Sequence, residues 1–435
     1  MAVRLRHGDA DFRDRFEQLV GARRQTLVDV DGDVAEIIAA VRERGDSALI
    51  ELSERFDRVT LTTQTLRIEP NEIAAATAQA STEQLDALRR AAARIEAYHA
   101  RQIPVDDWYT DAEGVGLGAR WTAIGAVGVY VPGGTAAYPS SVLMNAIPAR
   151  VAGVDRVAMV VPTPDGALNP LVLAAAGIAG VSEIYRVGGA QAVAALAYGT
   201  ETITPVDKIV GPGNAFVASA KRQVFGVVGI DMIAGPSEIL VVADADNDPA
   251  WIAADLMSQA EHDKNAQSIF VTNDDHFADS VATEIEHLLT RLTRADIARA
   301  SWQHQGAIII VESLDTAPSL INRLAPEHVE LAVAAPAQLA EEIRNAGAIF
   351  LGRFTPEAIG DYVAGPNHVL PTARSARFAS GLSVLDFVKR TSLIACDEAS
   401  VARIGPAAIA LAEAEGLEAH ALSVAIRLKS AGDQT

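Results

Sequence analysis

Residues 124–134 decide the fold, and they read Ile-Gly-Ala-Val-Gly-Val-Tyr-Val-Pro-Gly-Gly. Apolar residues dominate the first part of this stretch, and a turn of proline and glycine ends it, which is typical of a buried parallel strand that enters a loop. After about residue 121 the same order repeats: a short apolar run, a Gly or Pro turn and an alanine-rich helical segment. This alternation predicts parallel βαβ units and therefore an α/β protein.

The apolar runs form two blocks. The first block offers five strand candidates for a small doubly wound sheet, at residues 124–131, 156–161, 183–187, 208–210 and 239–242. The second block offers strands at 268–272, 306–311 and 348–351, separated by helical stretches such as 251–264 and 336–346. We therefore predict two α/β domains.

The two ends of the chain have a different pattern. Apolar residues at helical spacing predict helices over 33–44 and 82–100, with Gly45 and Pro104 as stops. After about residue 381 a tail follows, with helical segments at 406–420 and 421–429. Such a tail cannot form much core alone, so we expect it to pack on its own body or on a partner subunit.

Composition excludes several classes of protein. Asp and Glu number 56 against 36 Lys and Arg, which gives a formal charge of −20 and a field that repels phosphate backbones. We expect no nucleic-acid partner. With 435 residues, 49% of them hydrophobic, the chain can bury a core large enough for two or more domains.

Cysteine content and apolar run length bear on the compartment. The single cysteine, Cys396, excludes an internal disulfide or a cysteine-rich cluster and favours a reducing compartment, the cytoplasm. Residues 1–10 are mixed and charged, and no stretch of about 18 uncharged apolar residues occurs. We expect neither secretion nor a membrane span.

Three glycine-rich loops, at 125–134, 188–191 and 211–214, are candidates for a nucleotide site. None has the GxGxxG fingerprint, because Phe216 stands at the third glycine's place in the last of them. Each could be a tight turn that binds nothing. Loops at the carboxyl ends of neighbouring parallel strands meet at one sheet edge, where their N–H groups can hold phosphate, so together they favour a nucleotide-like ligand.

Metal-ligand side chains occur in three segments. Gln259 and His262 lie three residues apart in a predicted helix, so they share a face and can reach a common ion. The other candidates stand in a Gly-rich segment and near the C-terminus: Asp361, His368, Glu415 and His420. Such residues are common on solvated surfaces, and only the fold could gather them. If gathered, their nitrogen and oxygen ligands suit zinc or a similar ion.

The segment 324–331, Leu-Ala-Pro-Glu-His-Val-Glu-Leu, carries an adjacent Glu327 and His328. Pro326 suits the first position of a helix, so we predict both residues in a first helical turn. The pair offers two proton acceptors of different intrinsic pKa, as a reaction with two deprotonations requires. The same dipeptide is also common at solvated helix starts.

Together these stretches resemble the histidinol dehydrogenase family over nearly the whole chain. The matching segments are Asp-Met-Ile-Ala-Gly-Pro-Ser-Glu at 231–238, Ala-Asp-Leu-Met-Ser-Gln-Ala-Glu-His at 254–262, and the shorter stretches 130–134, 325–328, 361–372 and 415–420. One departure is the stretch 372–377, where arginines stand in place of a more Gly-rich turn. It touches none of the candidate ligands.

The resemblance implies specific roles for site residues. It implies one Zn²⁺ per subunit, bound by Gln259, His262, Asp361 and His420. It implies acid/base catalysis by Glu327 and His328, and substrate contacts from Ser237, Glu357, His368 and Glu415 in addition to the zinc ligands and His328. It implies an NAD site lined by Tyr130, Gln191 and Asn214.

The resemblance also implies an architecture and a reaction. It implies two incomplete Rossmann-like domains: 26–129 plus 238–381 with most zinc and catalytic residues, and 130–237 with NAD. An N-terminal helical segment, 1–25, and a tail domain, 382–435, flank them, and the tail of a homodimer crosses to the partner's site. The reaction is oxidation of L-histidinol to L-histidine through a bound, hydrated aldehyde, with two NAD reduced. Cys396 lies outside every motif, so a thioester route fits less well.

Two other functions remain open. A related zinc- and NAD-dependent enzyme could act on another primary alcohol, such as a sulfonated diol; a carboxylate such as Glu415 better suits a cationic amino alcohol. A non-catalytic zinc-binding scaffold would not need the pair Glu327 and His328.

Overall fold

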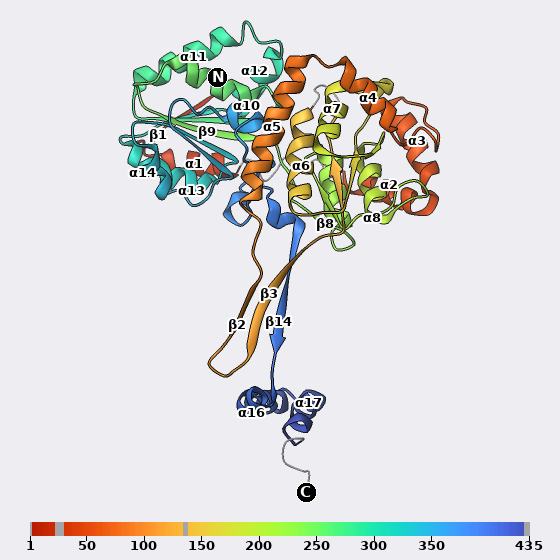
Figure 1. Ribbon diagram of the computed structural model, residues 1–435. Coiled ribbons are helices and arrows are strands. Elements are labelled where there is room, and N and C mark those ends of the chain that lie inside the picture. The colour runs from red at the N-terminus through yellow and green to blue at the C-terminus, as the bar shows by residue number, and fades with distance from the viewer. Residues whose placement is uncertain (1, 22–29, 134–137, 430–435) are drawn as a thin grey trace.

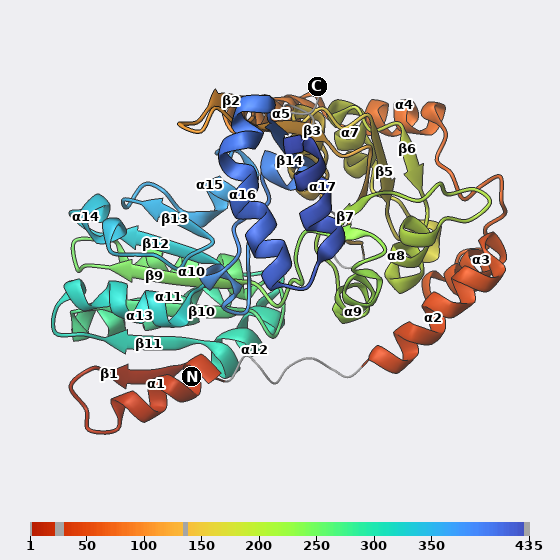
Figure 2. The same ribbon diagram turned by 90° about the horizontal axis from the view of Figure 1, so that it is seen from below.

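Two α/β domains lie side by side, and a long arm projects from them to a small helical tail (Figures 1 and 2). The computed structural model describes residues 2–21, 30–133 and 138–429. Each domain is built on a parallel sheet with helices on both of its faces, so the α/β prediction is confirmed.

One domain contains a five-stranded parallel sheet with the order β6-β5-β4-β7-β8. Its strands are β4 (Ala126–Tyr130), β5 (Arg156–Val160), β6 (Glu183–Tyr185), β7 (Lys208–Val210) and β8 (Gly229–Ile230). Four of them match the predicted runs. The fifth predicted run, 239–242, belongs to the other sheet, and the short β8 takes the edge.

Helices from two parts of the chain cover this sheet. One core packs α2 (Asp31–Arg44), α3 (Asp46–Asp57), α8 (Gly189–Tyr198) and α9 (Ala215–Val224) on one face. The opposite core contains α4 (Pro70–Gln79), α5 (Thr82–Ala100), α6 (Pro139–Val151) and α7 (Pro170–Ala179). Residues 31–100 thus pack with 124–230, whereas the family resemblance implied that 26–129 belongs with 238–381. The apolar stripe of a helix shows that it is buried but does not identify the sheet that it covers.

The other domain contains a six-stranded parallel sheet with the order β1-β11-β10-β9-β12-β13. Its strands are β1 (Val3–Arg6), β9 (Glu238–Ala243), β10 (Gln267–Thr272), β11 (Ala307–Ile310), β12 (His328–Ala332) and β13 (Ala348–Leu351). Without β1, this order of successive strands is the same as in the smaller sheet. The segment 1–25 was expected to be helical, but Val3–Arg6 is an edge strand paired with β11, and residues 22–29 lie outside the described parts.

The helices of this domain fall on two faces. One face carries α10 (Pro249–Ala260), α11 (Asp275–Leu288) and α12 (Ala295–Gln305). The other carries α1 (Phe12–Gly21), α13 (Ala317–Leu324) and α14 (Pro336–Glu341). The short α15 (Glu357–Tyr362) contacts α10. In the described part of the chain, no helix combines the length and apolar character needed to cross a membrane.

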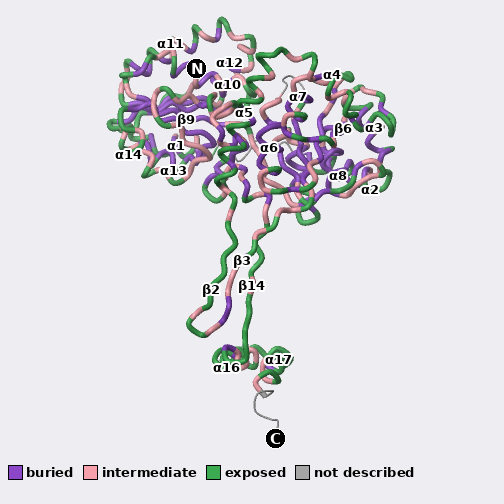
Figure 3. The backbone as a smooth tube through the Cα atoms, in the orientation of Figure 1, coloured by how far each residue is buried: buried purple, intermediate pink, exposed green. Residues whose placement is uncertain are grey.

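The arm is an antiparallel sheet with the order β14-β3-β2. It consists of β2 (Asp107–Thr110), β3 (Gly116–Ala123) and β14 (Val388–Ala395), and it ends in α16 (Glu398–Ala414) and α17 (Glu418–Lys429). The two tail helices pack on each other, and Arg403 of α16 donates to the carbonyl of Glu113 at the hairpin tip (2.8 Å). Arm and tail are largely exposed (Figure 3). The described helices of the tail, α16 and α17, therefore do not pack on the body of their own chain.

Candidate active site

His328 is the first residue of β12, which lies between β9 and β13. The prediction of a helix that starts at Pro326 is wrong, because His328 pairs in register with Ile239 and Ala348 of the neighbouring strands. Glu327 and His328 therefore stand at the amino ends of the strands. Side chains alternate along a strand, so His328 shares the α10 face with Ala332.

The imidazole of His328 is fixed in one tautomer. Its Nδ1 lies 2.9 Å from the carbonyl oxygen of Glu238, which can only accept, so Nδ1 carries the hydrogen. Its Nε2 is buried and has no hydrogen-bond partner among the described residues. Burial lowers the pKa of His328 to about 4, although the nearby Glu357 carboxylate opposes the shift. At neutral pH the ring is neutral, and its free Nε2 can accept a proton.

Glu327 and Glu238 hold each other through their backbones. The Oε2 atom of Glu327 accepts the N–H of Glu238 at 2.9 Å, and the Oε2 atom of Glu238 accepts the N–H of Glu327 at 3.3 Å. Both carboxylates are buried, and Glu327 Oε2 lies 3.7 Å from Nδ1 of His328. Glu327 and His328 thus share one support, the first residue of β9.

Gln259 and His262 lie at the carboxyl end of α10. Gln259 is inside the helix, whereas His262 is two residues beyond its end, so the helix predicted over 251–264 is shorter than expected. Nε2 of Gln259 lies 3.0 Å from Nδ1 of His262, and the buried Oε1 of Gln259 has no partner among the described residues. Burial lowers the pKa of His262 to about 4. This pair can offer an amide oxygen and a neutral imidazole to an ion.

Glu357 and Asp361 face His328 from α15. Nε2 of His328 lies 3.8 Å from Oε1 of Glu357 and 3.9 Å from Oδ1 of Asp361, and potential ligand atoms of the three residues all lie within 4.8 Å of one another. Burial raises the pKa of Glu357 to about 8 and that of Asp361 to about 6. Ser258 donates to Oε2 of Glu357 at 3.3 Å and so ties α15 to α10.

The donor set fits a zinc ion. Buried carboxylates without a cationic partner are costly, and a divalent ion would stabilise their charged forms. Three buried atoms of this group have no hydrogen-bond partner among the described residues: Gln259 Oε1, His328 Nε2 and Glu357 Oε1. Neutral imidazoles, an amide oxygen and carboxylates are ligands that zinc accepts.

His368 and Ser237 border this group. Nδ1 of His368 lies 3.0 Å from the carbonyl oxygen of Asp361, and burial lowers the pKa of His368 to about 4. Its Nε2 lies 3.5 Å from Oγ of Ser141, which belongs to α6 of the other domain. Ser237 is half-buried and immediately precedes Glu238, and its carbonyl accepts the N–H of Gln267.

The predicted glycine-rich loops meet at the carboxyl edge of the five-stranded sheet. The N–H of Gly189 donates to the hydroxyl of Tyr130 at 3.0 Å, and a Cβ at Gly211 would lie 2.1 Å from the carbonyl oxygen of Tyr130. Gln191 is buried in the first turn of α8, and Asn214 caps α9 by accepting the N–H of Val217. Gly134 of the first loop lies outside the described residues. The edge forms a backbone cradle of the kind that can receive a dinucleotide.

Comparison with known proteins decides the family. The family model described as histidinol dehydrogenase matches residues 21–428. The chain belongs to the histidinol dehydrogenase family. It is 62% identical over 429 residues to a histidinol dehydrogenase of Rhodospirillum rubrum, covering 98% of this chain and 99% of the relative. A histidinol dehydrogenase of Ruegeria pomeroyi is 63% identical over 418 residues and is covered to 96%, as is this chain.

A solved structure agrees with the sequence comparison. The crystal structure of histidinol dehydrogenase from Elizabethkingia anophelis matches with a TM-score of 0.94 at 37% identity, over 99% of each chain. Enzymes of the histidinol dehydrogenase family are NAD-dependent oxidoreductases that use zinc. The donor set around Asp361 and the loops around Tyr130 fit these two groups.

Two residues that the resemblance links to the metal and substrate are not near the others in this chain. Glu415 directly follows α16 and His420 lies in α17, and both are exposed on the tail, which the arm holds away from the body (Figures 1 and 3). The structure therefore brings together Gln259, His262, Glu327, His328, Glu357, Asp361 and His368, but not Glu415 and His420.

Sequence reasoning missed two residues that shape the site. Pro162 follows β5, and added Cβ atoms at Gly133 and Gly188 would clash with it at 2.6 and 2.3 Å, so it joins two of the glycine loops. Attention to the loop after every predicted strand would have found it. Glu238 was quoted only as the end of a family-like segment, although a buried acid that starts a strand signals a specific partner.

Proposed function

We propose that this chain oxidises L-histidinol to L-histidine through bound L-histidinaldehyde and reduces two NAD in the process. The observation that supports this most is the group of His328, Glu357 and Asp361, of which the first two are buried and the third is half-buried, at the meeting of β12, α10 and α15. Together with family membership, it provides a proton acceptor next to a site fit for a metal.

We propose that zinc is held by Gln259, His262 and Asp361 of one subunit and by His420 of the partner subunit. Bound zinc would orient the substrate through its imidazole and amino groups, the templating role of a metal. The remaining substrate contacts in this proposal come from Ser237, His328, Glu357 and His368, and from Glu415 of the partner subunit. Glu357 and His368 each lie beside Asp361, which supports their part.

His328 is the proposed base of the alcohol step. Its tautomer leaves the Nε2 lone pair free, and Nδ1 is anchored on Glu238, so the ring can take the hydroxyl proton without turning. Tyr130, Gln191 and Asn214 would hold NAD, which would supply the hydride acceptor when bound. Only 4% of His328 is exposed, so the base is buried within the site.

Glu327 is the proposed base of the aldehyde step. Its carboxylate is oriented by the Glu238 N–H, and it would take a proton from the water that hydrates the aldehyde. A thioester route needs a cysteine in the site, but Cys396 is exposed and lies just beyond β14 in the arm. The hydrate route therefore fits this chain better.

A stoichiometric assay tests the proposal. Zinc-loaded enzyme should form two NADH for each L-histidinol consumed and should prefer L-histidinol to a sulfonated diol. One NADH per substrate would contradict the double oxidation, and preference for the sulfonated compound would remove the histidinol assignment.

We further propose a homodimer in which each tail completes the partner's site. The tail exposes large apolar side chains, among them Leu411 at 66% and Leu422 at 59%, which a packed partner would cover. His420 and Glu415 are on this same unit. The exposed, unpaired Cys396 suits a reducing compartment, and we propose that the enzyme works in the cytoplasm.

Subunit mixing tests the exchange of tails. A His328→Asn chain and a His420→Ala chain should each be inactive alone, because every site of either homodimer lacks one residue. A mixed dimer would contain one complete site, so refolding the two together should recover about a quarter of wild-type activity. No recovery in a confirmed mixed dimer would show that the tail serves its own chain.

A further inference from the structure

Asp57 lies at the carboxyl edge of the NAD domain, beside the glycine loops. It ends α3, a helix that packs on this sheet, and its carboxylate accepts the N–H of Thr163, just after β5, at 3.4 Å. It also acts electrostatically on the buried hydroxyl of Tyr130, whose pKa burial raises to about 12. Asp57 thus borders the cradle in which Tyr130 and Gly189 meet.

Arg58 acts on the Asp57 carboxylate electrostatically but donates its hydrogen bonds to another acid. Arg58 donates to both carboxylate oxygens of Asp165, at 2.7 and 2.6 Å, so its guanidinium is engaged. Among the described residues only the Thr163 N–H donates to Asp57. The carboxylate is half-buried, and burial raises its pKa above the ordinary value. Such a group gains from a hydroxyl donor supplied by a ligand.

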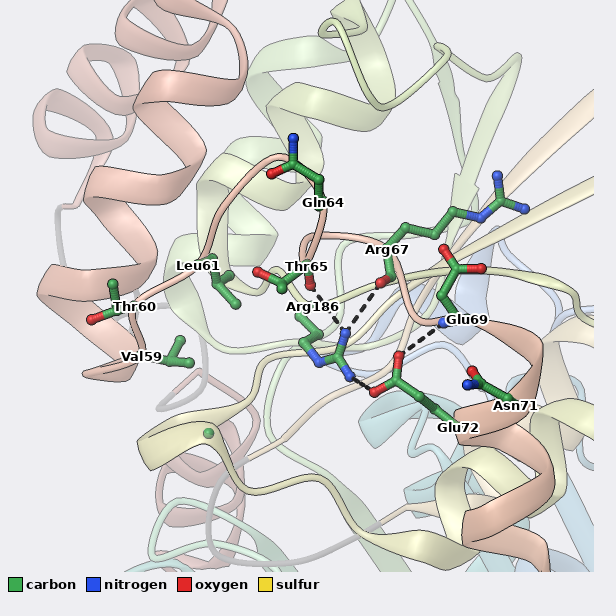
Figure 4. Close-up of a pocket in the computed structure, with 11 residues that line it drawn as sticks. Val59, Thr60, Leu61, Gln64, Thr65, Arg67, Glu69, Asn71, Glu72 and Arg186 are labelled. Atoms are coloured by element: carbon green, nitrogen blue, oxygen red, sulfur yellow. Dashed lines mark hydrogen bonds and ion pairs between the residues drawn. The ribbon is translucent and has the colours of Figure 1, made fainter.

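A groove lies next to Asp57. It has a volume of about 440 Å³ and starts at Val59 and Gly166, close in sequence to Asp57 and Thr163. Arg186, after β6, lines this groove and donates to the carbonyls of Thr65 and Arg67 and to Glu72 (Figure 4). The groove therefore lies beyond β5 and β6, on the side of the cradle away from β7.

Dinucleotide-binding folds use an acidic residue for the adenosine ribose. A carboxylate there accepts the 2′-hydroxyl of NAD, and an arginine accommodates the 2′-phosphate of NADP. Here the acid comes from α3 and not from the sheet, and the nearest arginine, Arg58, is already paired. We infer that Asp57 binds the adenosine 2′-hydroxyl of NAD, with the adenine in the groove from Val59 to Arg186, and so selects NAD against NADP. This inference rests on the proposed NAD site.

Binding measurements on the zinc-loaded, full-length enzyme test the inference. Asp57→Asn should weaken NAD binding about tenfold, because a charged hydrogen bond is lost, and should lower the preference for NAD over NADP by at least about tenfold. Glu54→Gln, on the exposed side of α3, should change neither affinity. Gln191→Ala should weaken both cofactors alike. An unchanged preference in folded Asp57→Asn would overturn the inference.

A second measurement needs no variant. Wild-type enzyme should bind NAD that lacks the adenosine 2′-hydroxyl about tenfold more weakly than NAD. Equal affinity for the two would overturn the role of Asp57 while leaving the NAD site intact. Failure of the wild-type enzyme to bind NAD at all would overturn the proposed function itself.

Discussion

The two α/β domains share one strand order but use opposite edges of their sheets. In the five-stranded sheet the loops that can receive NAD follow the carboxyl ends of β4, β6 and β7, as in other doubly wound folds. In the six-stranded sheet the catalytic candidates stand at the amino ends of β9 and β12, where Glu238, Glu327 and His328 meet. The same architecture therefore offers two chemically different edges. One presents backbone N–H groups, and the other presents buried acids and imidazoles.

Removal of zinc should have the largest effect, and this effect should be confined to the domain with the six-stranded sheet. Chelation should abolish histidinol oxidation and added zinc should restore it, because the carboxylates of Glu357 and Asp361 lose their cation. NAD affinity, measured by titration of the chelated enzyme, should change by less than about twofold, since the cofactor loops lie in the other domain. A parallel loss of NAD binding would show that the two edges are not independent.

Substitution of each proposed base at the amino edge should separate the alcohol step from the aldehyde step. His328→Asn should slow histidinol oxidation by about 10²–10⁴-fold, whereas Glu327→Gln should mainly slow oxidation of added histidinaldehyde. Rapid-mixing assays with each substrate measure the two rates. The reverse pattern would exchange the roles of the two residues. Zinc content should stay at the wild-type value in both variants.

A buried ion pair supports the carboxyl edge in the other domain. Nζ of Lys221 donates to the carbonyl of Gly211 (2.9 Å) and to Asp231, which also accepts the N–H of Gly211 (2.8 Å). Lys221→Met should lower the free energy of unfolding by about 3–5 kcal/mol, because Asp231 stays buried without its cation. Urea unfolding followed by circular dichroism measures this loss.

The double change Lys221→Met with Asp231→Asn is the matched control. It removes both charges and should recover part of the stability. Both variants should bind NAD more weakly, because the loop from Gly211 to Asn214 loses its anchor. Unaltered NAD affinity in the folded single variant would separate the anchor from the cofactor site.

The smallest expected effect concerns His99, which is buried in α5 beside the base of the arm. Its Nδ1 lies 2.8 Å from the carbonyl of Ile95, and burial lowers its pKa below 6.5. The unfolded chain then binds a proton before the folded chain does, so stability falls as the pH drops through about 6.5. His99→Gln should flatten the fall of Tm between pH 7.5 and 5 by a few degrees. An unchanged slope would assign the acid sensitivity to other groups.

The sequence predicted regular elements better than it predicted the active edge. Regular apolar patterns identified the strands at 156–161 and 208–210 and the helix at 82–100. Such a pattern arises when one face of an element, or the whole strand, is buried in an apolar core. The strand β12 was missed because its inward positions carry His328 and Glu330, whose burial depends on partners from α10 and α15. The three strands of the arm were missed because their exposed residues bury no regular apolar face.

Candidate residues were identified more readily than their arrangement. Gln259 and His262 could be paired because three positions in one helix fix a distance, whereas Asp361 is linked to them only through the contact of α15 with α10. Glu238 acts through its backbone N–H and carbonyl as well as its carboxylate. Every residue except proline has these backbone groups, so the residue type does not reveal such a role.

The arm that carries His420 away from its own body has a consequence for metal uptake. If the fourth zinc ligand arrives from a second molecule, zinc affinity and subunit association become linked equilibria. Dilution should then release metal, and metal should tighten the assembly. A cell short of zinc would accumulate separated subunits with exposed apolar tails, and these are the form most open to proteolysis.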